Sequence, residues 1–133
     1  MHALQDLQDA LQHATPKYII FDSFTGNNPD RDDQLNSDIS TYMIQMMEIC
    51  KEKNIKMFIE TMPNCPERTN WYKNDAFINK TGEFANYDYE IIDVAHSVGA
   101  GDTVYSDWYE GMLYTDKVHP TKLGALSYYL QVI

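Results

Sequence analysis

The sequence predicts a layered α/β fold built on a parallel sheet. Segments in which apolar residues recur at helical spacing alternate along the chain with short apolar runs that are typical of buried strands. That alternation is characteristic of domains in which helices pack on a parallel sheet. With 133 residues, 44% of them hydrophobic, residues 1–133 have the length and apolar content of a single domain with its own core.

The first half of the chain predicts two helices and one strand. Three leucines at helical spacing predict a helix over residues 2–13, which ends before Pro16. The apolar run at residues 18–21 predicts a buried strand, and a polar loop rich in Gly, Asn, Pro and Asp follows it. The clearest helix is expected over residues 35–53. Its apolar side carries Ile39, Met43, Met46, Met47 and Cys50.

The second half predicts two more strands and a closing helix. The apolar run at residues 55–59 is expected to be the second strand, and residues 66–82 are expected to form a loop with some helix. Residues 89–94 predict the third strand, which is followed by a stretch that is mainly loop. The closing helix is expected over residues 120–132, with Pro120 in its first turn.

The charge and cysteine content argue against several classes of partner. The chain carries a formal net charge of −10, from 20 acidic and 10 basic residues. Such a balance repels phosphate groups, so we expect neither a nucleic acid nor an anionic membrane as a partner. No signal peptide or membrane-spanning apolar run is visible, and the sequence indicates no compartment. Cys50 and Cys65 do not form a Cys-x-x-Cys pair, which argues against a structural zinc site.

Asp116 and His119 are the most informative pair in the chain. A carboxylate three residues before a histidine can hold the imidazole in one tautomer and stabilise it when it takes a proton. Such a pair serves a serine nucleophile as its base, so the spacing favours ester hydrolysis. Structural alternatives stay open, because Asp116 can cap the closing helix and His119 can be a capping or surface residue.

A second candidate group lies in the loop after the first strand, at the carboxyl edge of the predicted sheet, where catalytic groups of α/β folds gather. The amide of Asn28 can donate a hydrogen bond to a developing oxyanion, and Asn27 is the substitute if the register differs by one residue. Gly26 would let this loop approach a substrate closely. The alternative is that these residues only form a turn.

In this order, the two motifs resemble conserved blocks of the SGNH (GDSL-type) hydrolases, a family of esterases, lipases and carbohydrate deacetylases. The family's Gly-x-Asn-Asp block is similar to Gly26-Asn27-Asn28, with Pro29 in place of the aspartate. Its Asp-x-x-His-Pro block is similar to the residues DKVHPTKLGA at 116–125. The resemblance implies a flavodoxin-like, three-layer αβα fold with a parallel sheet.

The resemblance also implies a chemistry. It is acyl transfer by a Ser-His-Asp triad, with His119 as base, Asp116 as its orienting carboxylate, and Asn28 and Gly26 at the oxyanion site. The substrate implied is a small-molecule or carbohydrate ester, such as an O-acetylated sugar. No metal or organic cofactor is implied.

The family's Gly-Asp-Ser block, which carries the nucleophile, has no clear counterpart here. The resemblance therefore covers the C-terminal part of the family's domain, and we expect an incomplete fold whose serine is missing from this chain. Ser23 is a weak candidate, since Phe21 stands where the block has glycine. The stretch from Ser23 to Asp116 also leaves too little room for the missing strands and helices. We expect the isolated chain to be inactive.

Two other functions remain alternatives at this point. One is a binding or assembly module that kept the fold and lost the chemistry. The other is a fragment of a ribokinase-like sugar kinase, because Gly99-Ala100-Gly101-Asp102 matches the Gly-Ala-Gly-Asp of those enzymes, where glycines at a helix start form an anion hole. Such kinases need a much larger domain, and the residues that follow do not predict a long helix.

A missing first strand would also leave part of the sheet uncovered. In the SGNH fold that the resemblance implies, the strand at residues 18–21 has the nucleophile strand as its neighbour. Without that neighbour, an open edge and an apolar face are exposed. We therefore expect either a homo-oligomer formed through the exposed sheet edge or a shift of the first helix to cover it.

Overall fold

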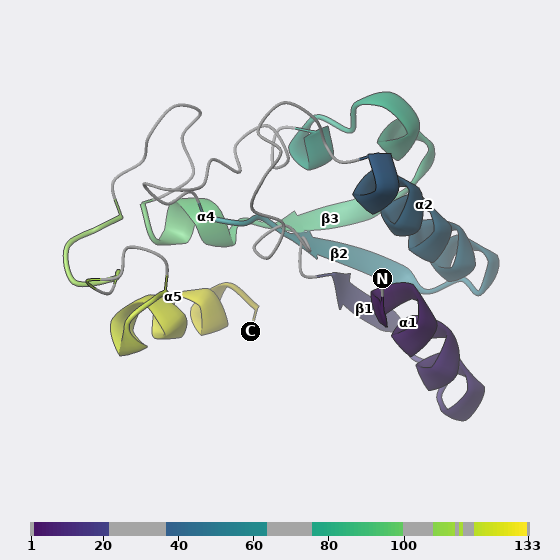
Figure 1. Ribbon diagram of the computed structural model, residues 1–133, viewed down its shortest axis with the longest axis horizontal. Coiled ribbons are helices and arrows are strands. Elements are labelled where there is room, and N and C mark those ends of the chain that lie inside the picture. Colours follow the sequence, from purple (N-terminus) through teal and green to yellow (C-terminus); the bar gives the residue numbers. More distant parts are fainter. Residues whose placement is uncertain are drawn as a thin grey trace.

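The computed structural model describes residues 2–21, 37–63, 76–99, 108–113, 115 and 119–132. Helices and strands alternate through most of this part of the chain, as Figure 1 shows. The order of the elements is α1 (His2–His13), β1 (Tyr18–Phe21), α2 (Ser37–Glu52), β2 (Lys56–Glu60), the 3-10 helix η1 (Gly82–Asn86), β3 (Tyr89–Ile92), α4 (Val94–Ser97) and α5 (Lys122–Val132).

The strands of the described residues form a parallel sheet in the order β1-β2-β3 (Figure 1). β1 pairs with β2 along its whole length, and β2 pairs with β3 with Met57 opposite Tyr89. Because the strands run in one direction, their carboxyl ends at Phe21, Glu60 and Ile92 meet at the same edge of the sheet. The described residues that follow β2 and β3 therefore lie close together at this edge.

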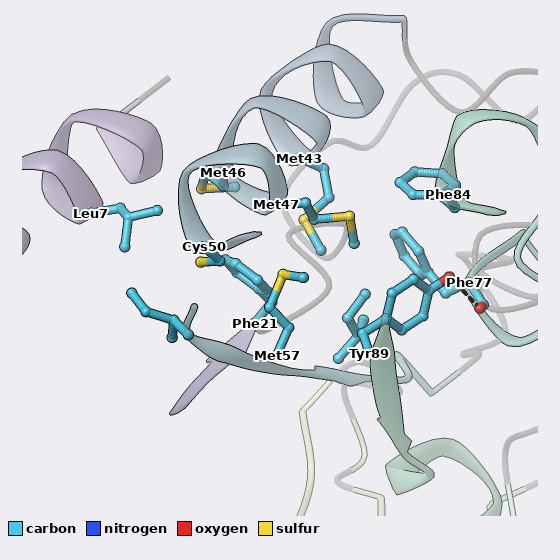
Figure 2. Packing of buried hydrophobic residues seen from close by; sticks show 12 residues of the cluster. Leu7, Phe21, Met43, Met46, Met47, Cys50, Met57, Phe77, Phe84 and Tyr89 are labelled. Atoms are coloured by element: carbon cyan, nitrogen blue, oxygen red, sulfur yellow. Dashed lines mark hydrogen bonds between the residues drawn. The ribbon is translucent and has the colours of Figure 1, made fainter. Parts of the chain in front are cut away.

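One face of the sheet carries the hydrophobic core. α2 buries an apolar stripe at helical spacing against this face, and α1 adds Leu7 beside it (Figure 2). Around Tyr89, the rings of Phe77 and Phe84 pack edge to face with centroids 5.0 Å apart. The Tyr89 hydroxyl donates a hydrogen bond of 2.6 Å to the Phe77 carbonyl, which closes the core at that end. The α2 residues in the core are Met43, Met46, Met47 and Cys50.

The opposite face of the sheet is only partly covered. Side chains alternate between the faces of a strand, so Tyr18 and Ile20 of β1 and Phe58 of β2 point away from the core. α5 lies on this side, opposite α2 (Figure 1), and its Gln131 lines an open groove of about 580 Å³ together with these side chains. Tyr18 is 64% exposed and Ile20 is 43% exposed. The structure thus has the expected three layers, with its second helical layer incomplete over the described residues.

The main elements follow the expected order, with shifted boundaries: α2 ends at Glu52 rather than at residue 53, and β2 spans Lys56–Glu60 rather than residues 55–59. The short helices η1 and α4 were not expected from the sequence. The third strand ends at Ile92 rather than at residue 94, because Asp93 caps α4 and accepts the backbone N–H of His96. α5 begins at Lys122 rather than at Pro120, because Pro120 forms an isolated antiparallel bridge with Leu113. The expected burial of the methionines and of Cys50 on α2 is confirmed.

Candidate functional site

The carboxyl edge of the sheet is held together by a buried threonine. The Thr61 backbone N–H donates to the Ile92 carbonyl over 3.0 Å, which extends the contact between β2 and β3 by one residue. Its hydroxyl donates to Oδ1 of Asp93 over 3.1 Å and accepts the N–H of Ala95 over 2.9 Å. Thr61 is 2% exposed. Thr61 therefore fixes the end of β3 through its backbone N–H and the start of α4 through its side chain.

Asp93 and His96 form a carboxylate–imidazole pair at this edge. Nδ1 of His96 lies 2.9 Å from Oδ1 and 2.7 Å from Oδ2 of Asp93. Both side chains are about half exposed, so the far side of the imidazole is open to solvent. A ring held in this way presents Nε2 as an acceptor whenever Nδ1 carries the proton. The pair is also a local cap of α4, since the same carboxylate accepts the His96 N–H over 3.2 Å.

His119 is exposed and lies immediately before the segment that starts α5. Pro120 bridges to Leu113, and the Thr121 N–H donates to the Met112 carbonyl over 2.8 Å. The Thr121 hydroxyl donates to the Gly111 carbonyl over 2.6 Å and accepts the Gly124 N–H over 3.2 Å, which caps the first turn of α5. The backbone on the carboxyl side of His119 is therefore fixed by several hydrogen bonds.

The helix that follows His119 is joined to the carboxyl edge of the sheet. Ser127 of α5 donates a hydrogen bond of 3.0 Å to the Ser97 carbonyl at the end of α4. α4 in turn follows β3 directly and is capped by Asp93. Through these contacts, α5 is positioned relative to the edge at which the strands end.

The structure describes one of the five site residues expected from the sequence, His119, and places it before α5 as expected. Gly26, Asn28, Ser23 and Asp116 lie outside the described residues, and so does the alternative Asn27. The expected contact between His119 and Asp116, and the expected oxyanion site, therefore stay predictions. The helix-capping alternative for Asp116 is weakened, because Thr121 takes that role at α5.

Sequence reasoning missed the pair formed by Asp93 and His96. The signal was present, because Asp93-Val94-Ala95-His96 has the same Asp-x-x-His spacing as residues 116–119. It was hidden by the expectation that β3 extends to Val94, which places Asp93 inside a strand and His96 in the loop that follows it. The short helix α4 brings them together instead.

Gly99 has a structural role that differs from a phosphate-binding start of a helix. It ends α4, where its N–H donates to the His96 carbonyl over 3.0 Å at a φ of 81°. Tyr109 packs so closely that a Cβ at this position would lie 2.9 Å from its ring. The remaining residues of the kinase-like motif, 100–102, lie outside the described residues.

Two buried groups near the core have shifted acidities. Burial raises the pKa of the Cys50 thiol to about 11 and that of the Tyr89 hydroxyl to about 12. A thiol with such a pKa is a packing group rather than a nucleophile at neutral pH. In the part of the chain that the structure describes, no group of His, Cys, Asp and Glu residues is arranged to hold a metal ion. No described helix is long and apolar enough to cross a membrane.

Comparisons with known proteins bear on the fold. No family model matches the sequence, and no curated protein matches it. Among solved structures, the crystal structure of TesA is similar, with a TM-score of 0.69 at 17% sequence identity. The similarity covers 97% of this chain and 67% of the TesA chain. The expected α/β fold is therefore confirmed: this chain has the fold of TesA, over about two thirds of that protein's length.

Proposed function

We propose that this chain is the base-carrying part of an SGNH-type carboxylic-ester hydrolase. The observation that carries the proposal is the position of His119-Pro120, directly before the closing helix of a fold that is similar to TesA's. TesA has an SGNH-type hydrolase fold. In an α/β fold of this kind, the segment after the last strand of the sheet is one of those from which catalytic groups come.

The proposed chemistry is acyl transfer through a serine supplied by a segment outside this chain. His119 takes the proton from the serine hydroxyl as its oxygen bonds to the acyl carbon, and gives that proton to the alcohol as the ester C–O bond breaks. Water then releases the acid by the same steps. Asp116 holds the imidazole of His119 in the required tautomer. Asn28 donates to the oxyanion, a contribution of roughly 3 kcal/mol to the barrier, and Gly26 lets its loop come close.

The proposed substrate is a small ester, with O-acetylated carbohydrate as the first class to test. The net charge of −10 suits a neutral substrate better than an anionic one. Aromatic side chains are also available for stacking on a sugar ring, since Tyr109 is largely exposed next to Trp108 in the loop before α5.

The test is hydrolysis of p-nitrophenyl acetate by the gene product that contains this chain together with the serine-bearing segment. His119→Ala should lower kcat/KM by roughly 10²–10⁴-fold, the usual contribution of a general base. His96→Ala is the matched control, because His96 is paired with Asp93 at the same spacing at the same edge of the sheet. Loss of activity in His96→Ala with little effect of His119→Ala would move the base to the other pair.

The second candidate is a non-catalytic SGNH-like binding or assembly module. The lack of a Gly-Asp-Ser block and the partly uncovered sheet favour it for the chain by itself. A fluorophosphonate probe separates the two, because it labels a serine that an imidazole base activates. We expect no labelling of Ser23 in the isolated chain. A covalent adduct on Ser23 would contradict both this expectation and the proposal that the serine comes from elsewhere.

A further inference from the structure

An exposed aromatic ring lies at the end of α4, beside the carboxyl edge of the sheet. Tyr109 is 59% exposed, yet its backbone and its ring are both held in place. Its N–H donates to the Val98 carbonyl over 2.9 Å. Its ring lies so close to Gly99 that a Cβ at Gly99 would be 2.9 Å from Cδ1 and 3.0 Å from Cγ of the ring. The ring is therefore fixed against the glycine, and the rest of it is open to solvent.

The pair of Asp93 and His96 lies near this ring. The Gly99 N–H donates to the His96 carbonyl, so His96 is about one helical turn, or about 5 Å along the helix axis, from the glycine that supports the Tyr109 ring. Both side chains of the pair are about half exposed, and the Thr61 hydroxyl holds the carboxylate in place. The pair offers solvent a carboxylate oxygen and the ring nitrogen Nε2, which accepts a hydrogen bond when Nδ1 carries the proton.

The turn that carries Tyr109 is hydrogen-bonded to the segment that follows His119. The Met112 N–H donates to the Tyr109 carbonyl over 3.0 Å, which closes the turn. The Thr121 N–H donates to the Met112 carbonyl over 2.8 Å, two residues after His119. α4 and α5 also lie side by side near this edge, as Figure 1 shows. A molecule that binds on the Tyr109 ring is therefore held close to the segment that carries the proposed base.

A fixed aromatic ring beside hydrogen-bond acceptors fits a neutral pyranose. In sugars of the glucose or xylose configuration, the hydroxyl groups are equatorial and the axial C–H groups form an apolar face, which packs on an aromatic ring. The hydroxyl groups at the margin of that face donate to acceptors such as a carboxylate or an imidazole nitrogen. An acidic sugar is disfavoured, because the side chains of Asp93 and Glu110 are exposed here and the chain carries a net charge of −10.

We propose that Tyr109, Asp93 and His96 form a subsite for a neutral pyranose of glucose or xylose configuration. The sugar stacks on the Tyr109 ring, and its hydroxyl groups donate to Asp93 and His96. The subsite deepens the proposed function and rests on it in one respect, namely that the sugar is the alcohol part of the ester that His119 helps to cleave. Binding of the sugar itself requires neither the serine nor His119. Since p-nitrophenyl acetate carries no sugar, these contacts do not enter the test of the base with that ester.

NMR titration of the 133-residue chain with xylotetraose and with cellotetraose tests the proposal. We expect saturable shifts of the amides in residues 93–99 and 108–112 with at least one of them, at a dissociation constant on the order of 1 mM. Tyr109→Ala should raise this constant by roughly tenfold, because the stacking surface is lost, whereas Tyr109→Phe keeps the ring and should change it by less than about twofold. His96→Ala should raise it by roughly two- to tenfold, because one hydrogen bond is lost. Trigalacturonate should bind at least roughly tenfold more weakly than the neutral sugar.

Tyr18→Ala is the matched control, because Tyr18 is also an exposed tyrosine, at 64%, but lies on β1 away from the subsite. Its dissociation constant should equal that of the unchanged chain, and circular dichroism checks that each variant folds. The proposal is overturned if neither tetrasaccharide gives saturable shifts up to about 10 mM, if the shifts centre on Tyr18, or if folded Tyr109→Ala binds as tightly as the unchanged chain. Tight binding of trigalacturonate also overturns it. A chain that binds the sugar through Tyr109, in a gene product that does not cleave p-nitrophenyl acetate, supports the subsite and contradicts the hydrolase proposal alone.

Discussion

Gly124, in the first turn of α5, lies directly against the carbonyl group of Met112. A methyl group added at Gly124 would overlap the Met112 carbonyl oxygen and come within 3.1 Å of Cβ of Pro120. This close approach allows the Thr121 N–H to reach the Met112 carbonyl and lets Pro120 bridge to Leu113. The lack of a side chain at Gly124 thus allows the backbone that follows His119 to pack closely against residues 112–113.

Gly124→Ala should therefore destabilise the chain, although alanine is the better helix former. The clash is with backbone atoms that cannot rotate away, and overpacking of this kind costs about 1–3 kcal/mol. The free energy of unfolding in urea measures the effect. Ala125→Ser, at the exposed neighbouring position, is the control and should change it by less than about 0.5 kcal/mol. A Gly124→Ala chain as stable as the original would show that Met112 and α5 are not packed in this way.

Thr61→Val should loosen the carboxyl edge of the sheet. The substitution keeps the shape of the side chain but leaves the buried N–H of Ala95 without its acceptor and removes a donor from Asp93. An unpaired buried donor costs about 1–3 kcal/mol, to be measured by urea unfolding. Thr61→Ser keeps both hydrogen bonds and loses one methyl group, so it should lower the free energy of unfolding by only about 0.8 kcal/mol. If the Thr61→Val chain proves as stable as the unchanged chain, the Thr61 hydroxyl does not join β2 to α4.

The stability of the chain should fall in alkaline solution through Tyr89. Burial raises the pKa of its hydroxyl from 10.0 to about 12 in the folded state. The folded chain therefore holds this proton where the unfolded chain has lost it, so the stabilisation is fully present below pH 10 and is lost as the pH rises toward 12.

Tyr89→Phe isolates this contribution. At pH 8 the substitution should cost about 0.5–1.5 kcal/mol, because the hydrogen bond to the Phe77 carbonyl is lost. At about pH 11 the cost should shrink, since the unchanged chain now loses stability by ionisation in the unfolded state and the variant does not. Urea unfolding of both chains at the two pH values measures the cost of the substitution in free energy of unfolding. An equal cost at the two pH values would mean that Tyr89 is not held in its neutral form by the fold.

The sequence predicted the sheet and the main helices because their apolar residues recur at the spacing of those elements. Met43, Met46, Met47 and Cys50 recur at helical spacing and are buried together. Tyr18 and Ile20 of β1 are exposed, in agreement with the expectation of a partly uncovered sheet. These features depend on local pattern or on the order of motifs, and both can be read along the chain.

Other features depend on contacts between distant residues or on competition between two local signals. Val94 is a good strand former, but the cap that Asp93 provides starts α4 at that residue instead. Only the folded chain shows that Gly124 meets Met112. Of the candidate site, the structure describes His119, which lies before α5, and its role as a base stays a prediction. The pair of Asp93 and His96 could have been found by applying the Asp-x-x-His spacing to every histidine.

Chemical rescue tests the central claim most directly, namely that His119 is a base. In the gene product that also carries the serine, His119→Gly removes the imidazole and leaves space at an exposed position. Free imidazole added to this variant should restore hydrolysis of p-nitrophenyl acetate in proportion to its concentration, beyond its effect on the ester alone, and the same treatment of His96→Gly should restore nothing. A His119→Gly enzyme that keeps full activity, or that loses activity and is not rescued while His96→Gly is, would contradict the claim.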